Sequence, residues 1–246
     1  MSTNAECSVV LPVDEAIMKR RAMRRFKPDP LPDGLLEKLL NLANNAPSGY
    51  NLQPWHFLVV TDEAKKKQLQ VAALNQRQVA EAPAVVVFCG DTMAWKTHRE
   101  EMIKMAIDAG AFTPDSARQS RKNIWKGLSI GPLGLLGLAK AIILPIRRLF
   151  IPTPQIPTTY AGLRAYAAKH TMLAAQTFMI AARAYGLDTC PMEGFDEARI
   201  KRIFGVPRRM VIPVIVAVGY GVEDLPPKQP RLPLSMKLHL NQWTTS

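Results

Sequence analysis

Three short runs of consecutive apolar residues mark the strands expected in this chain, at residues 55–61, 84–89 and 211–220. Unbroken apolar runs of this length are typical of strands buried on both faces. Apolar residues at helical spacing predict helices over residues 13–21, about 35–43, 63–74, 92–109 and 161–185. Helix and strand signals therefore alternate, which indicates a mixed α/β or α+β sheet packed by helices.

Proline and glycine predict several boundaries of these elements. Pro32 and Asp33 suit the first turn of the second helix, where Pro lacks only an unused N–H and Asp favours the positive end of the helix dipole. Gly186 is the expected stop of the long alanine-rich helix. Pro213 indicates an irregularity or an edge position in the third strand. Four prolines after residue 223 predict an extended arm.

Residues 127–146, GLSIGPLGLLGLAKAIILPI, form one long apolar segment with basic residues on both sides. The segment is about as long as a membrane span, but Lys140, two prolines and four glycines interrupt it. The flanking charge also lacks the asymmetry usual for a spanning helix. We favour a mobile cover over a pocket or an element lying on a membrane surface. A core insertion comes next, and a transmembrane helix comes last.

The charge of the chain is concentrated in one stretch. The 246 residues carry a net charge of +12, yet no Asp or Glu occurs between Ser116 and Leu187. The basic residues of that stretch are Arg118, Arg121, Lys122, Lys126, Lys140, Arg147, Arg148, Arg164, Lys169 and Arg183. A localised positive field predicts an anionic partner, such as a membrane surface, a nucleic acid or a phosphorylated cofactor.

Composition narrows the class of protein further. Apolar residues make up 48% of the chain, which is ordinary for a globular protein and argues against disorder. Three cysteines, Cys7, Cys89 and Cys190, are too few and too scattered for a disulfide framework or a zinc ribbon. The four histidines show no metal-ligand spacing along the chain. The N-terminal MSTNAECSVVLPVDEA has no signal-peptide pattern, so the cytoplasm is the expected compartment.

No glycine-rich phosphate motif is present, since neither GxGxxG nor GxxxxGK[ST] occurs, and the hydrolase motif GxSxG is also absent. Another group of residues can bind phosphate instead. Arg20, Arg21 and Arg24 follow the first helix, and guanidinium groups match phosphate oxygens with pairs of hydrogen bonds. A solvated basic face is the alternative interpretation of this cluster.

Two loops offer further ligand-binding groups. The segment PSGYNLQPW, residues 47–55, presents backbone amides, a hydroxyl and two carboxamides to a polar heterocycle, although the same residues make ordinary turns. The segment PMEGFD, residues 191–196, contains Gly194, which permits close approach of the backbone to a flat ligand. Asp196 fits a helix N-cap there, so a plain loop with a cap is the alternative.

The order of these groups along the chain is more specific than any one of them. RRAMRRF, APSGYNLQPWHFLVV, EAPAVVVFC, GLDTCPMEGFD with VIPVIVAVGYG, and PPKQPRLP follow one another. In this order they resemble the nitroreductase family of FMN-dependent oxidoreductases over about residues 13–112 and 160–243. We therefore expect a single domain over residues 13–243. Residues 115–158 look like an insertion within it, and residues 223–246 like an extended C-terminal arm.

The resemblance implies an α+β fold with a central, mostly antiparallel sheet flanked by helices, in a domain-swapped homodimer with two FMN sites at the subunit interface. It implies that the FMN phosphate and the pyrimidine side of the flavin are held by Arg20, Arg21 and Arg24, and that the arm returns to the phosphate with Lys228 and Arg231. The partner subunit would contribute its Pro47, Ser48 and Asn51, and Asn75 would lie at the pyrimidine edge of the flavin. The turn of Met192, Glu193 and Gly194 would place a backbone N–H against flavin N5. Ala22 stands where the family usually has Ser, so one hydrogen bond of about 1 kcal/mol is expected to be missing.

The implied chemistry is transfer of two electrons from NAD(P)H through the flavin to a small nitroaromatic or quinone-like acceptor. The flavin carries this chemistry, so no catalytic side chain and no metal is required. Two alternatives stay open: a flavoenzyme of the same fold that destroys flavin, dehalogenates or reduces enoyl groups, and a membrane-associated flavin-binding partner protein. A nucleic-acid binder is disfavoured, because no RRM, KH or helix-turn-helix signature is present. The 115–158 segment is expected beside the flavin entrance, as a cover or as an element docked on an anionic membrane.

Overall fold

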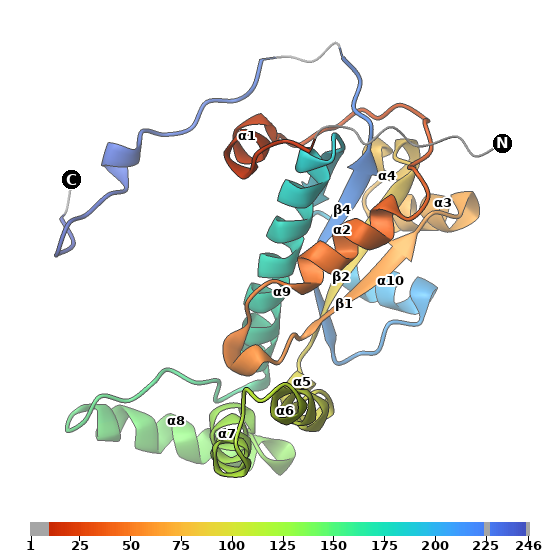
Figure 1. Cartoon of the computed structure of the whole chain (residues 1–246). Helices are drawn as coiled ribbons and strands as arrows, with labels where there is room; N and C mark the ends of the chain where they lie inside the picture. Colours follow the sequence, from red (N-terminus) through yellow and green to blue (C-terminus); the bar gives the residue numbers. More distant parts are fainter. Residues whose placement is uncertain (1–9, 224–226, 245–246) are drawn as a thin grey trace.

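Four antiparallel strands form the sheet of the described residues, in the order β1-β2-β4-β3 (Figure 1). The computed structural model describes residues 10–223 and 227–244, so Cys7 lies outside the described part. The strands are β1 (Trp55–Val60), β2 (Ala84–Asp91), β3 (Asp188–Met192) and β4 (Met210–Gly219). The sheet is antiparallel and the helices lie around it, which confirms the expected α+β class.

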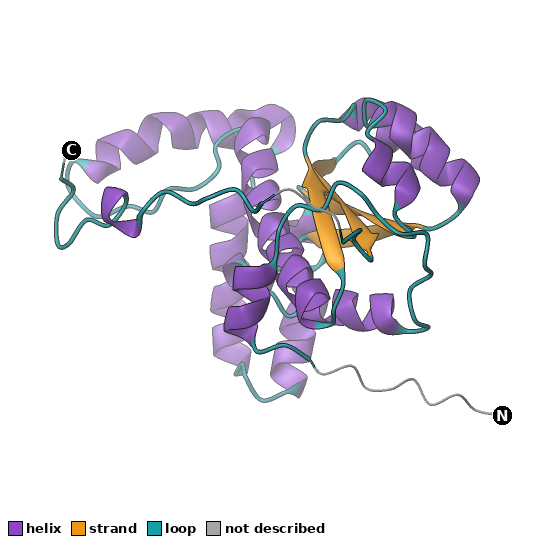
Figure 2. Ribbon diagram, turned by 90° about the horizontal axis from the view of Figure 1, so that it is seen from above, coloured by secondary structure: helices purple, strands orange, loops and turns teal. Residues whose placement is uncertain are grey.

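Helices surround this sheet on both faces (Figure 2). They are α1 (Val13–Lys19), α2 (Leu35–Asn44), α3 (Glu63–Ala72), α4 (Arg77–Glu81), α5 (Ala94–Thr97), α6 (Arg99–Asp108), α7 (Pro114–Leu128), α8 (Leu135–Arg148), α9 (Tyr160–Ala184) and α10 (Glu197–Phe204). Short 3-10 turns occur at Gly49–Asn51, Pro132–Gly134 and Leu234–Met236.

Strand β2 is buried along its whole length because helices cover both sides of it. Val85 and Val87 face the cluster that α3 and α10 close. Val86 and Phe88 face the opposite cluster, where Phe178 of α9 packs edge-on against Phe88 with ring centroids 5.6 Å apart. Burial of each such side chain contributes about 1.5–3 kcal/mol. The unbroken apolar runs of β2 and β4 are thus explained by burial on both faces, whereas the edge strand β1 exposes His56 and Val59.

Most elements expected from the sequence are present, with corrections at particular residues. The second helix begins only at Leu35, so Pro32 and Asp33 lie before it rather than in its first turn. Gly34 precedes the helix with a φ of 74°, a left-handed conformation that glycine adopts without strain. The predicted helix over residues 92–109 is two helices, α5 and α6, which meet at His98. Gly186 ends α9 as predicted, with a φ of 81°.

Pro213 marks an irregularity as expected, because the pairing of β2 with β4 shifts register between Phe88 and Gly90, opposite this proline. The edge interpretation is wrong for β4 as a whole, since β4 lies between β2 and β3. Strand β3, however, reaches only as far as the pair Met192–Ile215. Pro213 therefore lies where β4 has a partner on one side only, and its missing N–H costs no β3 hydrogen bond.

Strand β3 was not expected, because Pro191 and Met192 were assigned to a loop. Asp188 and Pro191 are poor strand formers, and five residues give little pattern. The strand forms because β4 offers it a complete antiparallel ladder from Ile215 to Gly219. Asp196 is an N-cap as predicted, and its side chain accepts a 2.9 Å hydrogen bond from the backbone N–H of Arg199.

Residues 115–158 form most of α7, then α8 and an extended return to α9, at the end of the molecule away from α1 (Figure 1). Helix α7 starts at Pro114 with a reciprocal capping box between Thr113 and Ser116. Within the described residues no single helix is long and apolar enough to cross a membrane. One pair, α7 with α8, passes that test by length and composition and is bent by 62°.

Candidate functional site

The basic cluster lies in an extended segment that runs beside β3. Ala22 forms a parallel bridge with Thr189, and the Met23 N–H donates a 2.9 Å hydrogen bond to the Thr189 carbonyl. Met23 is buried, whereas Arg20 is half-buried and Arg24 is exposed. Among the described residues, neither Arg20 nor Arg24 forms an ion pair. Both guanidinium groups are thus available to an anion.

A second segment, residues 74–76, meets the turn that follows β3. The side-chain amide of Gln76 donates a 2.9 Å hydrogen bond to the carbonyl oxygen of Gly194. Leu74 and Asn75 both have a φ of 57°, which turns the chain sharply after α3. A Cβ placed on Gly194 would meet no atom of the described chain closer than 3.8 Å. The outer face of this turn therefore has room for a flat ligand.

The basic segment and the Gly194 turn both adjoin β3, and the buried Cys190 of β3 lies between them. The positive charge of Arg24 and a hydrogen bond from Gln78 act on the Cys190 thiol. Gln78 in turn donates a 2.9 Å hydrogen bond to Gln76. Burial nevertheless raises the pKa of Cys190, more than these two groups lower it. Cys190 is therefore a neutral packing group at this surface and not a nucleophile.

Met192 and Glu193 differ in what they can offer a ligand. The Met192 side chain is 4% exposed and packs in the core on the α3 side of the sheet. Only its backbone is left for a ligand. Glu193 is exposed, and its carbonyl accepts a 3.1 Å hydrogen bond from the Phe195 N–H, which tightens the turn around Gly194.

The loop after α2 is held in an unusual backbone conformation. Tyr50, Asn51 and Gln53 have φ values of 57°, 53° and 44°. The Ser48 hydroxyl accepts a 2.9 Å hydrogen bond from the Gln53 N–H, and the Asn51 side-chain oxygen accepts one of 3.2 Å from the Gln53 amide. Positive φ at three non-glycine residues is a strain that structures retain mainly at functional sites.

This loop lies far from the basic segment within one chain. The Tyr166 hydroxyl donates a 3.2 Å hydrogen bond to the Gly49 carbonyl near the start of α9. The N-terminal segment is tied to the other end of α9, where the Leu11 N–H donates to the Ala184 carbonyl. At 1.5 Å per residue, Tyr166 and Ala184 are roughly 27 Å apart along the axis of α9. One chain therefore does not bring Pro47, Ser48 and Asn51 together with the arginines.

The arm approaches the basic segment at one of its two predicted contacts. The Lys228 ammonium group donates a hydrogen bond to the carbonyl oxygen of Met18, two residues before Arg20. Arg231 is exposed. The arm as a whole runs away from the sheet (Figure 1). Residues 224–226 and 245–246 of the predicted arm lie outside the described residues.

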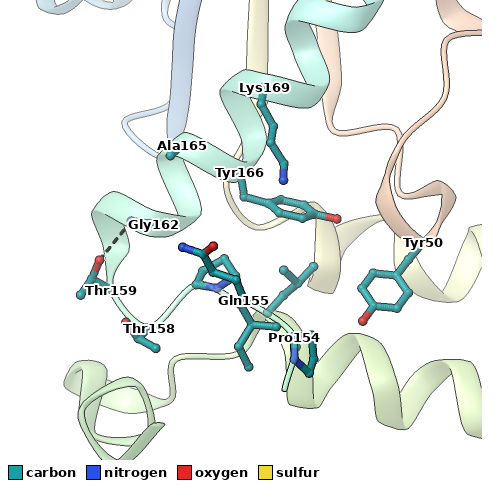
Figure 3. Close-up of a pocket in the computed structure, with 13 residues that line it drawn as sticks. Tyr50, Pro154, Gln155, Thr158, Thr159, Gly162, Ala165, Tyr166 and Lys169 are labelled. Atoms are coloured by element: carbon teal, nitrogen blue, oxygen red, sulfur yellow. Dashed lines mark hydrogen bonds between the residues drawn. The ribbon is translucent and has the colours of Figure 1, made fainter. Parts of the chain in front are cut away.

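Two cavities border Tyr50, and several residues that line them belong to no motif recognised in the sequence. The first, of about 650 Å³, lies between Tyr50 and α9, with Gln155, Tyr166 and Lys169 around it (Figure 3). Burial, with a smaller effect of Tyr50, raises the pKa of Tyr166 to about 12. Tyr166 thus stays protonated at neutral pH and can donate a hydrogen bond. Tyr166 and Lys169 lie on an alanine-rich helix whose pattern predicted packing only.

The second cavity, of about 520 Å³, lies between Tyr50 and helices α7 and α8. Trp125 of α7 and Leu136, Lys140 and Leu144 of α8 line it. The 115–158 segment therefore adjoins the 47–53 loop directly.

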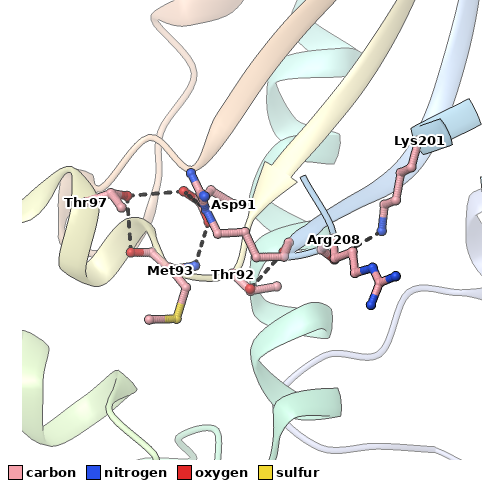
Figure 4. A network of polar contacts seen from close by, with 7 residues as sticks. Asp91, Thr92, Met93, Thr97, Lys201 and Arg208 are labelled. Atoms are coloured by element: carbon pink, nitrogen blue, oxygen red, sulfur yellow. Dashed lines mark hydrogen bonds and ion pairs between the residues drawn. The ribbon is translucent and has the colours of Figure 1, made fainter. Parts of the chain in front are cut away.

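Three residues with metal-ligand chemistry also come together, although no spacing along the chain indicated it. His56, Asp91 and His98 place one potential ligand atom each within 4.8 Å of one another. Asp91 is already engaged, however, by the Met93 N–H at 2.8 Å and by the Arg209 guanidinium at 3.1 Å, in a network of polar contacts (Figure 4). Because Arg209 neutralises the only carboxylate, we interpret this cluster as a structural ion-pair network.

The fold and these surfaces define a class of oxidoreductases built on an antiparallel sheet with helices on both faces. The sequence model of the nitroreductase family matches residues 17–220, and the chain belongs to this family. An NADH dehydrogenase of Thermus thermophilus is 34% identical over 225 residues, which cover 92% of this chain and 94% of the relative. An oxygen-insensitive NAD(P)H nitroreductase of Enterobacter cloacae is 30% identical over 209 residues, covering 81% and 85%.

Solved structures show the same fold. A nitroreductase-like protein of Streptococcus mutans superposes with a TM-score of 0.71 at 26% identity, covering 93% of this chain and 97% of the other. A protein of Exiguobacterium sibiricum crystallised in complex with FMN has a TM-score of 0.71 at 24% identity, covering 95% and 98%. The expected nitroreductase fold is thereby confirmed.

Proposed function

We propose that this protein is an FMN-dependent oxidoreductase that takes two electrons from NAD(P)H and passes them to a nitroaromatic, a quinone or a related acceptor. The observation that carries the proposal is the pair of arginines without acidic partners in the described chain, Arg20 and Arg24. They lie in the segment that bridges β3, and β3 leads into the open Gly194 turn that Gln76 fixes. The names of the relatives and the FMN complex of the E. sibiricum protein support the same conclusion.

The residues of this surface fit an FMN molecule chemically. Arg20, Arg21 and Arg24 supply positive charge for the phosphate and the pyrimidine side, and Asn75 supplies a carboxamide at the pyrimidine edge. Gln76 holds the carbonyl of Gly194, which leaves the N–H of the same turn to donate to flavin N5. FMN, when bound, supplies the hydride acceptor and the two-electron store. Positive charge near the ring favours the anionic reduced state over the neutral one.

We further propose that the protein works as a homodimer, in which Pro47, Ser48 and Asn51 of each chain complete the site of the other. The separation of this loop from the arginines along α9 supports that arrangement. Apolar side chains on the arm also support it, because Leu234, Leu240 and Trp243 are 70%, 73% and 80% exposed in one chain. A second chain would cover them, and Lys228 and Arg231 would reach the phosphate from this arm.

The 115–158 segment is proposed to border the acceptor entrance. Its cavity beside Tyr50 combines apolar side chains of α7 and α8 with three basic ones, Lys126, Lys140 and Arg147, which suits an apolar ring that carries oxygen acceptors, such as a quinone. We propose a cytoplasmic location, with which the free, buried thiols of Cys89 and Cys190 are compatible.

A direct experiment tests the proposed activity. The purified protein is expected to show a flavin absorbance spectrum, with FMN identified by mass after release at close to one per chain. Anaerobic stopped-flow mixing with NADH or NADPH should bleach that spectrum, and a benzoquinone or a nitrobenzoate should restore it. A colourless protein that takes up no FMN on reconstitution would disprove the cofactor. Bound FMN that neither nucleotide reduces would favour a flavin-binding partner protein instead.

A further inference from the structure

Helix α8 presents its apolar side to solvent. Five residues at spacings of three and four form a continuous line along one side of the helix and its last turn, which we call the outer stripe. They are Leu135, Leu138, Ile142, Ile146 and Leu149, with exposed fractions of 65%, 61%, 60%, 56% and 80%. A helix at the surface of a globular protein normally turns such a line toward the core.

The polar side of α8 faces the body of the protein. The Lys140 ammonium group donates a 2.5 Å hydrogen bond to the Ser129 carbonyl, and Lys140 and Arg147 both line the cavity next to Tyr50. Gly137 is buried, and its N–H donates a 2.9 Å hydrogen bond to the Ile130 carbonyl. Gly137 lies so close to the Thr158 backbone that a Cβ there would clash with it. These contacts fix the rotation of α8 with its outer stripe outward.

Further apolar side chains widen this surface, one within α8 and one beyond each of its ends. Leu133, Ile143 and Phe150 are 99%, 58% and 79% exposed. Soluble monomers rarely expose contiguous apolar patches of more than a few hundred Å², and larger ones mark contacts with proteins or membranes. Helices α7 and α8 lie together at one extremity of the molecule, so a flat partner can reach them without meeting the sheet (Figure 1).

Charge decides which partner suits the surface. Arg118 and Lys122 follow one another at four-residue spacing along α7, and Arg148 ends α8. Two further basic residues, Lys126 and Arg147, line the cavity beside Tyr50. None of these five forms an ion pair with any residue that the structure describes. A second copy would bring the same positive charge against this surface, whereas an anionic lipid surface would neutralise it.

The length of α8 specifies how it can meet a lipid bilayer. Its 14 residues extend over roughly 21 Å, which is less than the ~30 Å of the hydrocarbon core. A short helix with one wide apolar face lies in the plane of the membrane interface.

We propose that the protein docks on anionic membranes through α8, with the outer stripe in the acyl boundary and Arg118, Lys122 and Arg148 at the lipid headgroups. This inference goes beyond the proposed oxidoreductase activity and does not depend on a bound flavin.

Vesicle flotation tests the proposal with the full chain. The protein should float with vesicles of equal parts phosphatidylglycerol and phosphatidylcholine, and roughly tenfold less with pure phosphatidylcholine. Ile142→Glu should reduce the anionic-vesicle fraction at least about tenfold, because it puts a charge in the stripe. The matched control is Val71→Glu on α3, since Val71 is similarly exposed at 53% and lies on another surface. This control should float like the unchanged protein.

The contribution of charge has its own pair of variants. Arg118→Gln/Lys122→Gln should weaken flotation several-fold, whereas Lys65→Gln/Lys67→Gln on α3 should not. Far-UV circular dichroism verifies that each variant folds, and Ile142→Ser serves as a milder change should the glutamate prevent folding. Equal flotation of Ile142→Glu and the unchanged protein would overturn the proposal. So would sedimentation showing that Ile142→Glu splits a larger oligomer while neither protein binds vesicles, because a second copy would then cover the stripe.

Discussion

The side-chain amide of Gln76 donates a 2.9 Å hydrogen bond to the carbonyl oxygen of Gly194, 118 residues further along the chain. This contact joins the loop after α3 to the turn after β3. A second tie runs beside it, since the Asp196 N–H donates a 2.8 Å hydrogen bond to the Ala72 carbonyl. The turn that contains Gly194 is thus held at two points, Gly194 and Asp196, which is the preorganisation that a backbone donor to a flavin ring needs.

Gln76→Ala should therefore weaken FMN binding about fivefold, because one hydrogen bond of about 1 kcal/mol that orients the Gly194 peptide is lost. The dissociation constant is measured by quenching of FMN fluorescence during reconstitution. Gln68→Ala is the control, as Gln68 is exposed on α3 and should leave the constant within twofold. An unchanged constant in Gln76→Ala would separate the Gly194 turn from the flavin.

Arg20→Ala/Arg24→Ala should lower FMN affinity at least about a hundredfold, because hydrogen bonds between charged groups contribute about 1.5–3 kcal/mol each. The protein would then purify almost without colour. Arg25→Ala is a matched control in the same segment, since Arg25 lies 3.4 Å from Glu81 and is already paired. Full flavin content in the double variant would place the phosphate elsewhere.

A mixed dimer tests whether two chains share each site. In this arrangement, Arg20→Ala/Arg24→Ala damages one half of a site and Ser48→Ala/Asn51→Ala damages the other half. A heterodimer of the two variants, isolated with two different affinity tags, would hold one intact site and one with both defects. It should therefore bind about half the FMN of the unchanged dimer. If a single chain built its own site, both sites of the heterodimer would be damaged and FMN would stay low.

Stability should depend on pH through His170. Burial, assisted by the neighbouring positive charge of Lys169, lowers the pKa of His170 below its ordinary value of 6.5. Neither ring nitrogen has a hydrogen-bond partner among the described residues, and the ring packs edge-on against Tyr166. As the pH falls below 6.5, the unfolded chain takes up a proton that the folded chain refuses. The free energy of unfolding therefore falls until the pH passes the folded pKa.

Urea unfolding at pH 7.5 and pH 5.5 measures this effect. His170→Phe keeps a ring against Tyr166 and removes the titration, so the difference in unfolding free energy between the two pH values should shrink. His239→Phe is the control, because His239 stacks on Trp243 in the exposed arm. The same pH dependence in both variants and the unchanged protein would exclude His170 as its source.

The sequence by itself determined the elements whose signal is local. The apolar runs that became β2 and β4 are continuous because helices cover both faces of these strands, and burial of that kind leaves a direct trace in the residue types. Gly186 and Asp196 end and begin helices through contacts within a few residues. The order of the motifs was also readable, and it identified the family that the comparison with known proteins confirmed.

The tertiary structure alone decided the features that depend on distant partners. Strand β3 exists because β4 offers it a ladder, and nothing in Asp188 or Pro191 favours a strand. Gln76 gains its role from Gly194, far along the chain. The sequence showed that residues 127–146 are apolar, but the helix α8 and the direction of its apolar side depend on contacts such as the inward bond of Lys140 to Ser129. A pattern of residues fixes which side of a helix is apolar, whereas only the packing of the whole chain fixes which way that side points.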